Sequence, residues 1–231
     1  MADIKSISID SPEYPVRLKS ILNPPGILYV RGNAELLYNP GVSIVGTRDC
    51  SKAGAEIAKR IAQYLVEHGY TIVSGLALGI DAAAHEGGIK STIAVLAHGL
   101  HEAHPKANAG LAKRILDNGG AWVSEHPEGT SPNKNFFVPR NRIQVGLSIA
   151  SVIVESELKS GTMTHANFAL NENHLLFSVL PQTPENKLNL KYKGPEMLVK
   201  QKGAIPIRSK DDYEKILNKL DPIETYQANR L

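Results

Sequence analysis

Residues 42–85 read VSIVGTRDCSKAGAEIAKRIAQYLVEHGYTIVSGLALGIDAAAH, and this stretch decides the fold. It opens with a short apolar run of strand-forming residues that ends at Gly46. A helical pattern follows, with apolar residues three and four positions apart and a stop signal at Gly69. A second strand, residues 70–73, then leads into another glycine-rich turn. The segment therefore predicts two parallel strands joined by a helix, each followed by a strand-to-helix turn.

Both turns are expected at the carboxyl edge of one sheet, where free N–H groups and helix N-termini favour anions. A third glycine-rich opening, residues 160–162, follows a later strand. Any one of these glycines could simply allow close helix packing, but three turns on one edge predict an anion site. Its candidate residues are Gly46, Thr47, Arg48, Ser74, Gly75, Gly79, Ser160, Gly161 and Thr162.

The alternation of strands and helices continues on both sides of this unit. Further strands are expected over residues 27–32, 92–96, 121–124, 151–154, 175–179 and 204–207, and helices over 16–22, 107–116, 211–220 and from 160 onward. Residues 125–139 and 182–193 read as loops. Residues 27–32 are expected to add to the edge of the sheet. The other six or seven strands, with intervening helices, predict an α/β fold with an open, doubly wound, mostly parallel sheet. We expect an N-terminal extension, 1–40, packed on a main domain, 41–220, and a tail, 221–231.

The composition is ordinary for a globular protein, with 42% hydrophobic and 21% charged residues in 231. A net charge of +3 does not by itself identify a nucleic-acid partner. The single cysteine, Cys50, excludes an intrachain disulfide and suits a reducing compartment. Because no long apolar run and no signal-peptide pattern are present, we expect a cytoplasmic protein with no membrane partner.

Basic and aromatic residues alternate near residue 137. Lys134, Phe137, Arg140, Asn141 and Arg142 offer cations for phosphates and a ring for base stacking, which is the composition of a single-strand groove. Phe137 could instead be a core residue. In the first turn, Arg48 is well placed for a bidentate phosphate contact.

Catalytic and metal chemistry find less support in the sequence. The chain has neither a complete Gly-x-Gly-x-x-Gly motif nor a P-loop, so we expect no nucleotide cofactor. Asp81 and His85 are four residues apart on one helix, and a capping carboxylate and a core histidine explain them best. His98, His101 and His104 lack a helix to align them, and we expect no metal.

Three motifs resemble the DprA/Smf family, the DNA-processing proteins of bacterial natural transformation. They are Gly46-Thr47-Arg48, then Ser74-Gly75-x-Ala77-x-Gly79-Ile80-Asp81-x-x-Ala84-His85, then Pro139-Arg140-Asn141-Arg142-Ile143, and the resemblance covers roughly residues 12–207. It implies a Rossmann-like, non-enzymatic homodimer that binds and protects single-stranded DNA and helps to load a RecA-type recombinase. It also implies that residues 134–142 form the DNA-contacting wall, although the family's Phe-Pro-x-Arg is Phe-Val-Pro-Arg at residues 137–140.

Two other functions remain open. The wider superfamily includes enzymes, so the chain could be a nucleotide-binding protein or an N-glycosidic nucleotide hydrolase that uses Glu125 or Glu155. It could also be a phage or plasmid relative that interferes with recombination. A groove of arginines and rings suits a polymer, whereas a small-molecule site needs a closed pocket with placed carboxylates.

Overall fold

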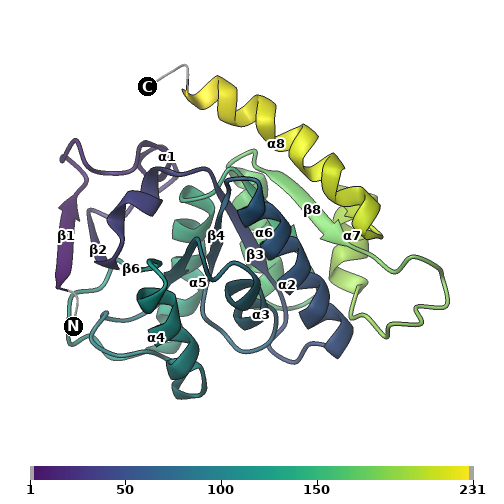
Figure 1. The fold of residues 1–231 in the computed structure, drawn as a ribbon, viewed down its shortest axis with the longest axis horizontal. Coiled ribbons are helices and arrows are strands. Elements are labelled where there is room, and N and C mark those ends of the chain that lie inside the picture. The colour runs from purple at the N-terminus through teal and green to yellow at the C-terminus, as the bar shows by residue number, and fades with distance from the viewer. Residues whose placement is uncertain (1–2, 229–231) are drawn as a thin grey trace.

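The computed structural model describes residues 3–228, which form one α/β unit with helices on both faces of a central sheet (Figure 1). The strands are β1 (Ile4–Ser8), β2 (Ile27–Gly32), β3 (Gly41–Val45), β4 (Thr71–Ser74), β5 (Thr92–Val95), β6 (Ala121–Ser124), β7 (Ala150–Ile153), β8 (Leu175–Val179) and β9 (Ile205–Ile207). The α-helices are α1 (Val16–Lys19), α2 (Lys52–Glu67), α3 (Ile80–Gly87), α4 (Ala109–Asp117), α5 (Lys134–Gly146), α6 (Gly161–Asn171), α7 (Lys193–Lys202) and α8 (Tyr213–Ala228). Short 3₁₀ turns cover Ala34–Tyr38, Lys106–Asn108 and Lys210–Asp212.

The strands lie in the order β1-β2-β6-β5-β4-β3-β7-β8-β9. All neighbours from β6 to β9 are parallel, and β2 pairs antiparallel with both β1 and β6. The predicted open, doubly wound, mostly parallel sheet is therefore confirmed. Nine strands are present in residues 3–228. Eight of them match ranges expected from the sequence, with β2 added at the edge of the six or seven main strands. The ninth, β1, is an edge strand that the sequence did not reveal, because Ile7 is its one buried residue.

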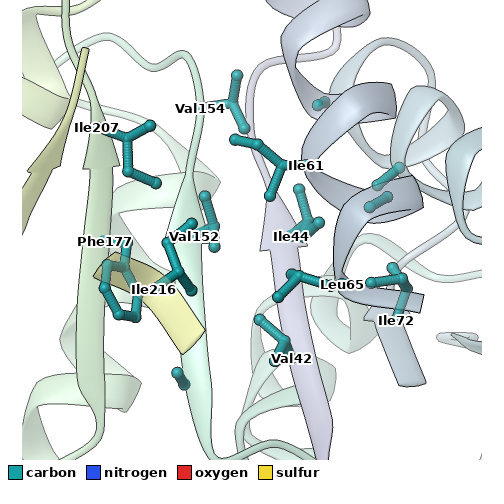
Figure 2. Close-up of a cluster of buried hydrophobic side chains, with 14 of the residues drawn as sticks. Val42, Ile44, Ile61, Leu65, Ile72, Val152, Val154, Phe177, Ile207 and Ile216 are labelled. Atoms are coloured by element: carbon teal, nitrogen blue, oxygen red, sulfur yellow. The ribbon is translucent and has the colours of Figure 1, made fainter. Parts of the chain in front are cut away.

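The core lies on both faces of this sheet. One face buries Val42 and Ile44 of β3 against Ile61 and Leu65 of α2, with Ile216 of α8 in the same cluster (Figure 2). Alternate residues of the same strands point to the opposite face, where α5 and α6 pack. Full burial of each such aliphatic side chain contributes about 1.5–3 kcal/mol. This two-sided packing explains why the strands read as continuous apolar runs.

Local signals set both ends of α2, and the stop at Gly69 is the one that the sequence predicts. Ser51 Oγ accepts a hydrogen bond from the N–H of Gly54 at 2.9 Å, and so caps the first turn. Gly69 follows the helix at φ +90°, a conformation that glycine adopts without strain. The turn before α3 also requires glycine, because Gly79 has φ +77° and a Cβ there would meet the carbonyl oxygens of Thr47 and Arg48.

The expected loop over residues 125–139 is wrong from Lys134 onward. Residues 134–146 form α5, whose first turn is capped by the side chain of Asn133. Two features hid this helix. Pro139 lies inside it, and the buried side chains include the polar residues Arg140, Asn141 and Gln144, where an amphipathic helix would carry apolar ones.

The C-terminal part contains two further differences. The sequence did not predict α7, because Gly194 and Pro195 occupy its first turn and Leu198 is its one buried large apolar residue. The helix expected over residues 211–220 is longer, since α8 continues to Ala228 and so takes up most of the expected tail. Residues 229–231 of that tail lie outside the described range. Between residues 3 and 228, no helix has the length and apolar character that crossing a membrane requires.

Candidate functional site

The order of strands in the sheet reverses direction between the neighbours β3 and β7. These strands are neighbours, but β3 is followed by β4 on one side and β7 by β8 on the other, so the segments that leave their carboxyl ends diverge. Such a switch point is where open α/β sheets form ligand crevices. A pocket of about 390 Å³ lies at this place. The predicted site residues that line it are Gly46, Thr47, Arg48, Phe137, Arg140, Asn141, Ser160, Gly161 and Thr162.

The first turn places an exposed cation at the pocket. Thr47 N donates to the carbonyl oxygen of Glu155 at 2.8 Å, which ties the turn after β3 to the end of β7. Arg48 is exposed, and its guanidinium carbon lies over the Phe137 ring at 5.5 Å from the centroid. The first turn therefore places a cation and an aromatic ring side by side at the pocket.

The second turn is built around Asp81. This carboxylate is buried and accepts hydrogen bonds from the backbone N–H groups of Gly46, Gly75 and Ala77. Burial raises its pKa above the usual range, and the nearby positive charge of Arg140 opposes that rise. Asp81 thus fastens the first two turns to each other. The same hydrogen bonds occupy N–H groups that the sequence analysis expected to face an anion.

Ser74, Gly75 and Gly79 serve this second turn without lining the pocket. Ser74 Oγ donates to the carbonyl oxygen of Ile44 at 2.7 Å and is fully buried. Gly75 is needed for space, because a Cβ at this position would overlap the Arg140 guanidinium. Gly75 therefore leaves room for Arg140, and Gly79 allows the second turn to pack closely against Thr47 and Arg48 of the first.

Arg140 is the pocket's second cation, and it is 6% exposed. Its Nη1 donates to the carbonyl oxygen of Val95 at 2.8 Å. The Gln144 amide, turned so that its oxygen faces the donors, accepts from Arg140 Nη1 at 3.2 Å and from Gly75 N at 2.9 Å. Burial lowers the pKa of Arg140 to about 10, and the carboxylate of Asp81 acts in the opposite sense. The guanidinium is therefore a charged floor of the pocket, held by structural contacts.

Arg142 points away from the pocket. Its Nη1 and Nη2 donate to Glu125 Oε1 and Oε2 at 2.8 and 2.6 Å, and its Nε donates to the carbonyl oxygen of Asn23. Arg142 therefore joins α5 to β6 and to the N-terminal segment. Two residues along a helix turn the side chain through about 200°, so a helical segment cannot direct Arg140 and Arg142 to the same side.

The third turn provides a helix N-terminus. Ser160 Oγ accepts from Met163 N at 3.3 Å, while Asn141 Nδ2 donates to the carbonyl oxygen of Gly161 at 3.4 Å. The first N–H groups of a helix have no partner within it. This geometry leaves those of Gly161 and Thr162, which line the pocket, for an anion.

The two remaining predicted residues lie at the start of α5. Phe137 is half-buried and borders the pocket, with its ring near Arg48 and near the ring of His104, 6.3 Å away between centroids. Lys134 is exposed at the first position of the helix and does not line the pocket. The sequence analysis did not identify Gln144 and His165, which also line the pocket. Gln144 is four residues after Arg140, and His165 is four residues after Gly161. This spacing places each pair on one face of a helix, but it indicates a shared site only when both segments are known to be helical.

The other titratable candidates have structural contacts. Glu155 is fully buried and accepts from Ser51 N, Ser51 Oγ and Lys191 N at 2.8, 2.7 and 3.0 Å. His85 Nδ1 contacts Thr92 Oγ1 at 2.7 Å, and burial lowers the pKa of this histidine to about 3. Burial raises the pKa of Cys50. In the part of the chain that the structure describes, no group of three or more potential metal ligands is found.

Several known proteins are similar to this chain in sequence and in fold. The family model of DNA recombination-mediator protein A matches residues 5–220. Protein Smf of Synechocystis is 39% identical, with 90% of this chain and 56% of the relative covered, and DNA processing protein DprA of Bacillus subtilis is 37% identical, with 90% and 70% covered. The chain thus spans little more than half the length of the Synechocystis relative. A solved structure of DNA processing protein A from Helicobacter pylori, described for its single-stranded-DNA binding mode, superposes with a TM-score of 0.84 at 28% identity, covering 95% of this chain and 99% of that one.

Proposed function

Because this chain belongs to the DNA recombination-mediator protein A family, we propose that it is a non-catalytic protein that binds and protects single-stranded DNA. The observation that supports this most directly is the pocket at the β3–β7 switch point, where Arg48, Arg140 and the N-terminus of α6 meet beside the Phe137 ring. Cations and helix N–H groups suit a backbone phosphate, and an adjoining ring suits an unpaired base.

The remaining parts of the family role are included in this proposal. We propose that the bound strand is passed to a RecA-type recombinase and that the protein works as a homodimer. We also keep the division into an extension, 1–40, a main domain, 41–220, and a tail. The description of the family as recombination mediators supports the first of these statements. Co-sedimentation of the recombinase with protein-coated strands, and the mass of the free protein in solution, test the first two.

The hydrolase alternative is less well supported by the geometry. Both carboxylates that it would use have full sets of partners: Glu155 accepts from three donors, and Glu125 pairs with both terminal nitrogens of Arg142. The pairing with Arg142 lowers the pKa of Glu125, which makes this group a weaker general base.

We expect the protein to bind single-stranded oligonucleotides without sequence preference, because phosphate contacts and stacking carry little base information. Fluorescence anisotropy with labelled homopolymeric and mixed-sequence strands at one salt concentration measures this. Mononucleotide binding and hydrolysis are assayed on the same preparation as the control. Tight binding to nucleoside monophosphates with none to oligonucleotides would contradict the proposal.

Exchanging each carboxylate for its amide separates the two functions. Glu125→Gln and Glu155→Gln should leave the affinity for single strands within a few fold, since neither side chain lines the pocket. Glu155→Gln should also lower the free energy of unfolding by about 1–3 kcal/mol, because its new NH₂ group faces backbone and hydroxyl donors. Urea denaturation measures this loss. If either variant abolished a hydrolytic activity of the wild type, the enzyme alternative would be favoured.

A further inference from the structure

A row of rings extends from the pocket along one side. Arg48 lies over Phe137, the Phe137 and His104 centroids are 6.3 Å apart with the planes tilted by 36°, and His98 meets His104 edge-on at 6.0 Å. These separations are within the range at which aromatic rings contact one another. The half-buried rings of Phe137 and His104 therefore continue the pocket toward the loop of residues 99–105, and His104 contacts the buried ring of His98.

Hydrogen bonds to His98 and to residues 129–130 hold this loop in place. His98 is 1% exposed, and its Nδ1 contacts the carbonyl oxygen of Gly99 at 2.8 Å. Gly99 N donates to the carbonyl oxygen of Thr130 at 2.9 Å, and Gly129 N donates to His101 Nδ1 at 3.1 Å. The two neighbouring loops thus brace each other, so the half-buried ring of His104 is positioned before any ligand binds.

Positive charge accompanies the rings on this side. Lys106, two residues beyond His104, and Lys134, one turn before Phe137, are both exposed. On the other side of the pocket, Lys191 is paired with Asp49, and the ring of its neighbour Tyr192 is partly buried against the hydrophobic core that includes α2 and β3. The first side therefore combines exposed cations with rings that continue outward from the pocket, which is the combination that single-strand grooves use.

We propose that His104 is a second base-stacking residue and that the single strand leaves the phosphate pocket across Phe137 toward residues 99–106. This inference rests on the proposed function of the pocket. It adds a subsite, a residue for that subsite and a direction for the strand. Lys106 contacts a phosphate of the same stretch.

The first test compares His104→Ala with His104→Phe. Anisotropy titrations use single strands of increasing length, from about 4 to about 16 nucleotides. His104→Ala should bind the longer strands on the order of tenfold more weakly, whereas His104→Phe, which keeps a ring, should bind nearly as the wild type does. His68→Ala is the matched control, since the ring of His68 also contacts an aromatic ring, that of Tyr64, in a tilted arrangement, but lies at the end of α2 and does not line the pocket.

The second test locates the bound strand on the wild-type protein by lysine labelling. An amine-reactive reagent is applied with and without a bound strand, and the labelling of each lysine is compared. Lys106 and Lys134 should be protected, and Lys187 and Lys193, which lie on either side of Lys191 in the chain, should not. This measurement decides the direction even if a His104 variant fails to fold.

The outcomes separate the inference from the proposed function. If the wild type binds no single strand, the proposed function fails. If it binds, but His104→Ala binds equally well and Lys187 and Lys193 are the protected lysines, the function stands and the path toward His104 is overturned.

Discussion

Replacing Arg140 with alanine should lower the free energy of unfolding by about 3–5 kcal/mol, because it leaves the buried carboxylate of Asp81 without the positive charge that opposes its desolvation. The guanidinium is 6% exposed, donates to the carbonyl oxygen of Val95 and fills the space left by Gly75. Its positive charge also opposes the rise in the pKa of the buried Asp81 carboxyl group. Urea denaturation of the wild type and the variant at neutral pH measures the loss.

The pH dependence shows how much of this loss is electrostatic. The folded-state pKa of Asp81 is raised, so its ionisation destabilises the fold as the pH rises through that value, and the stability of the protonated form is fully present below the unfolded pKa. Without Arg140 the pKa of Asp81 rises further. The deficit of the variant should therefore shrink on acidification, while that of Lys134→Ala, an exposed position on the same helix, should stay near zero. A large deficit that is the same at every pH would assign Arg140 a packing role alone.

The sequence predicts the fold well wherever secondary structure and apolar periodicity coincide. Residues 42–85 show this, because buried strands give continuous apolar runs and α2 buries a single stripe that includes Ile61 and Leu65. The helix α5 fails the same test. Its buried side includes Arg140, Asn141 and Gln144, which line the pocket. The apolar periodicity that identifies a helix is therefore absent in the segment that forms the site.

The candidate site is predictable in its chemistry more than in its geometry. The turns after β3 and β7 follow from the order of strands and helices, and they do meet at one pocket. The partition of charges does not follow. In a loop, Arg140 and Arg142 look equivalent, but on a helix one lies under the pocket and the other pairs with Glu125. Likewise, Asp81 occupies backbone N–H groups that were expected to hold an anion.

Phe137→Ala should reduce the affinity for single strands by about 1–3 kcal/mol and leave the salt dependence nearly unchanged, because a stacking contact releases no counterion. Arg48→Ala should show the opposite pattern. Loss of one phosphate contact lowers the slope of log affinity against log salt by about 0.7. Titrations at several salt concentrations, on variants shown by thermal melting to be folded, distinguish the two effects. Arg142→Ala, on the far side of α5, should leave the slope unchanged.

The two variants should not be independent, because the Arg48 guanidinium lies over the Phe137 ring in the free protein. A base that stacks on this face must share the ring with Arg48 or displace it, and a phosphate in the pocket draws the guanidinium away from the ring. The double variant Arg48→Ala/Phe137→Ala should therefore lose a different amount of binding free energy from the sum of the single losses, by at least about 0.5 kcal/mol. Strict additivity would place the base elsewhere. If Phe137→Ala bound normally but melted far lower, Phe137 would be a core residue, and if Arg48→Ala kept the full salt slope, the first turn would lie off the DNA path.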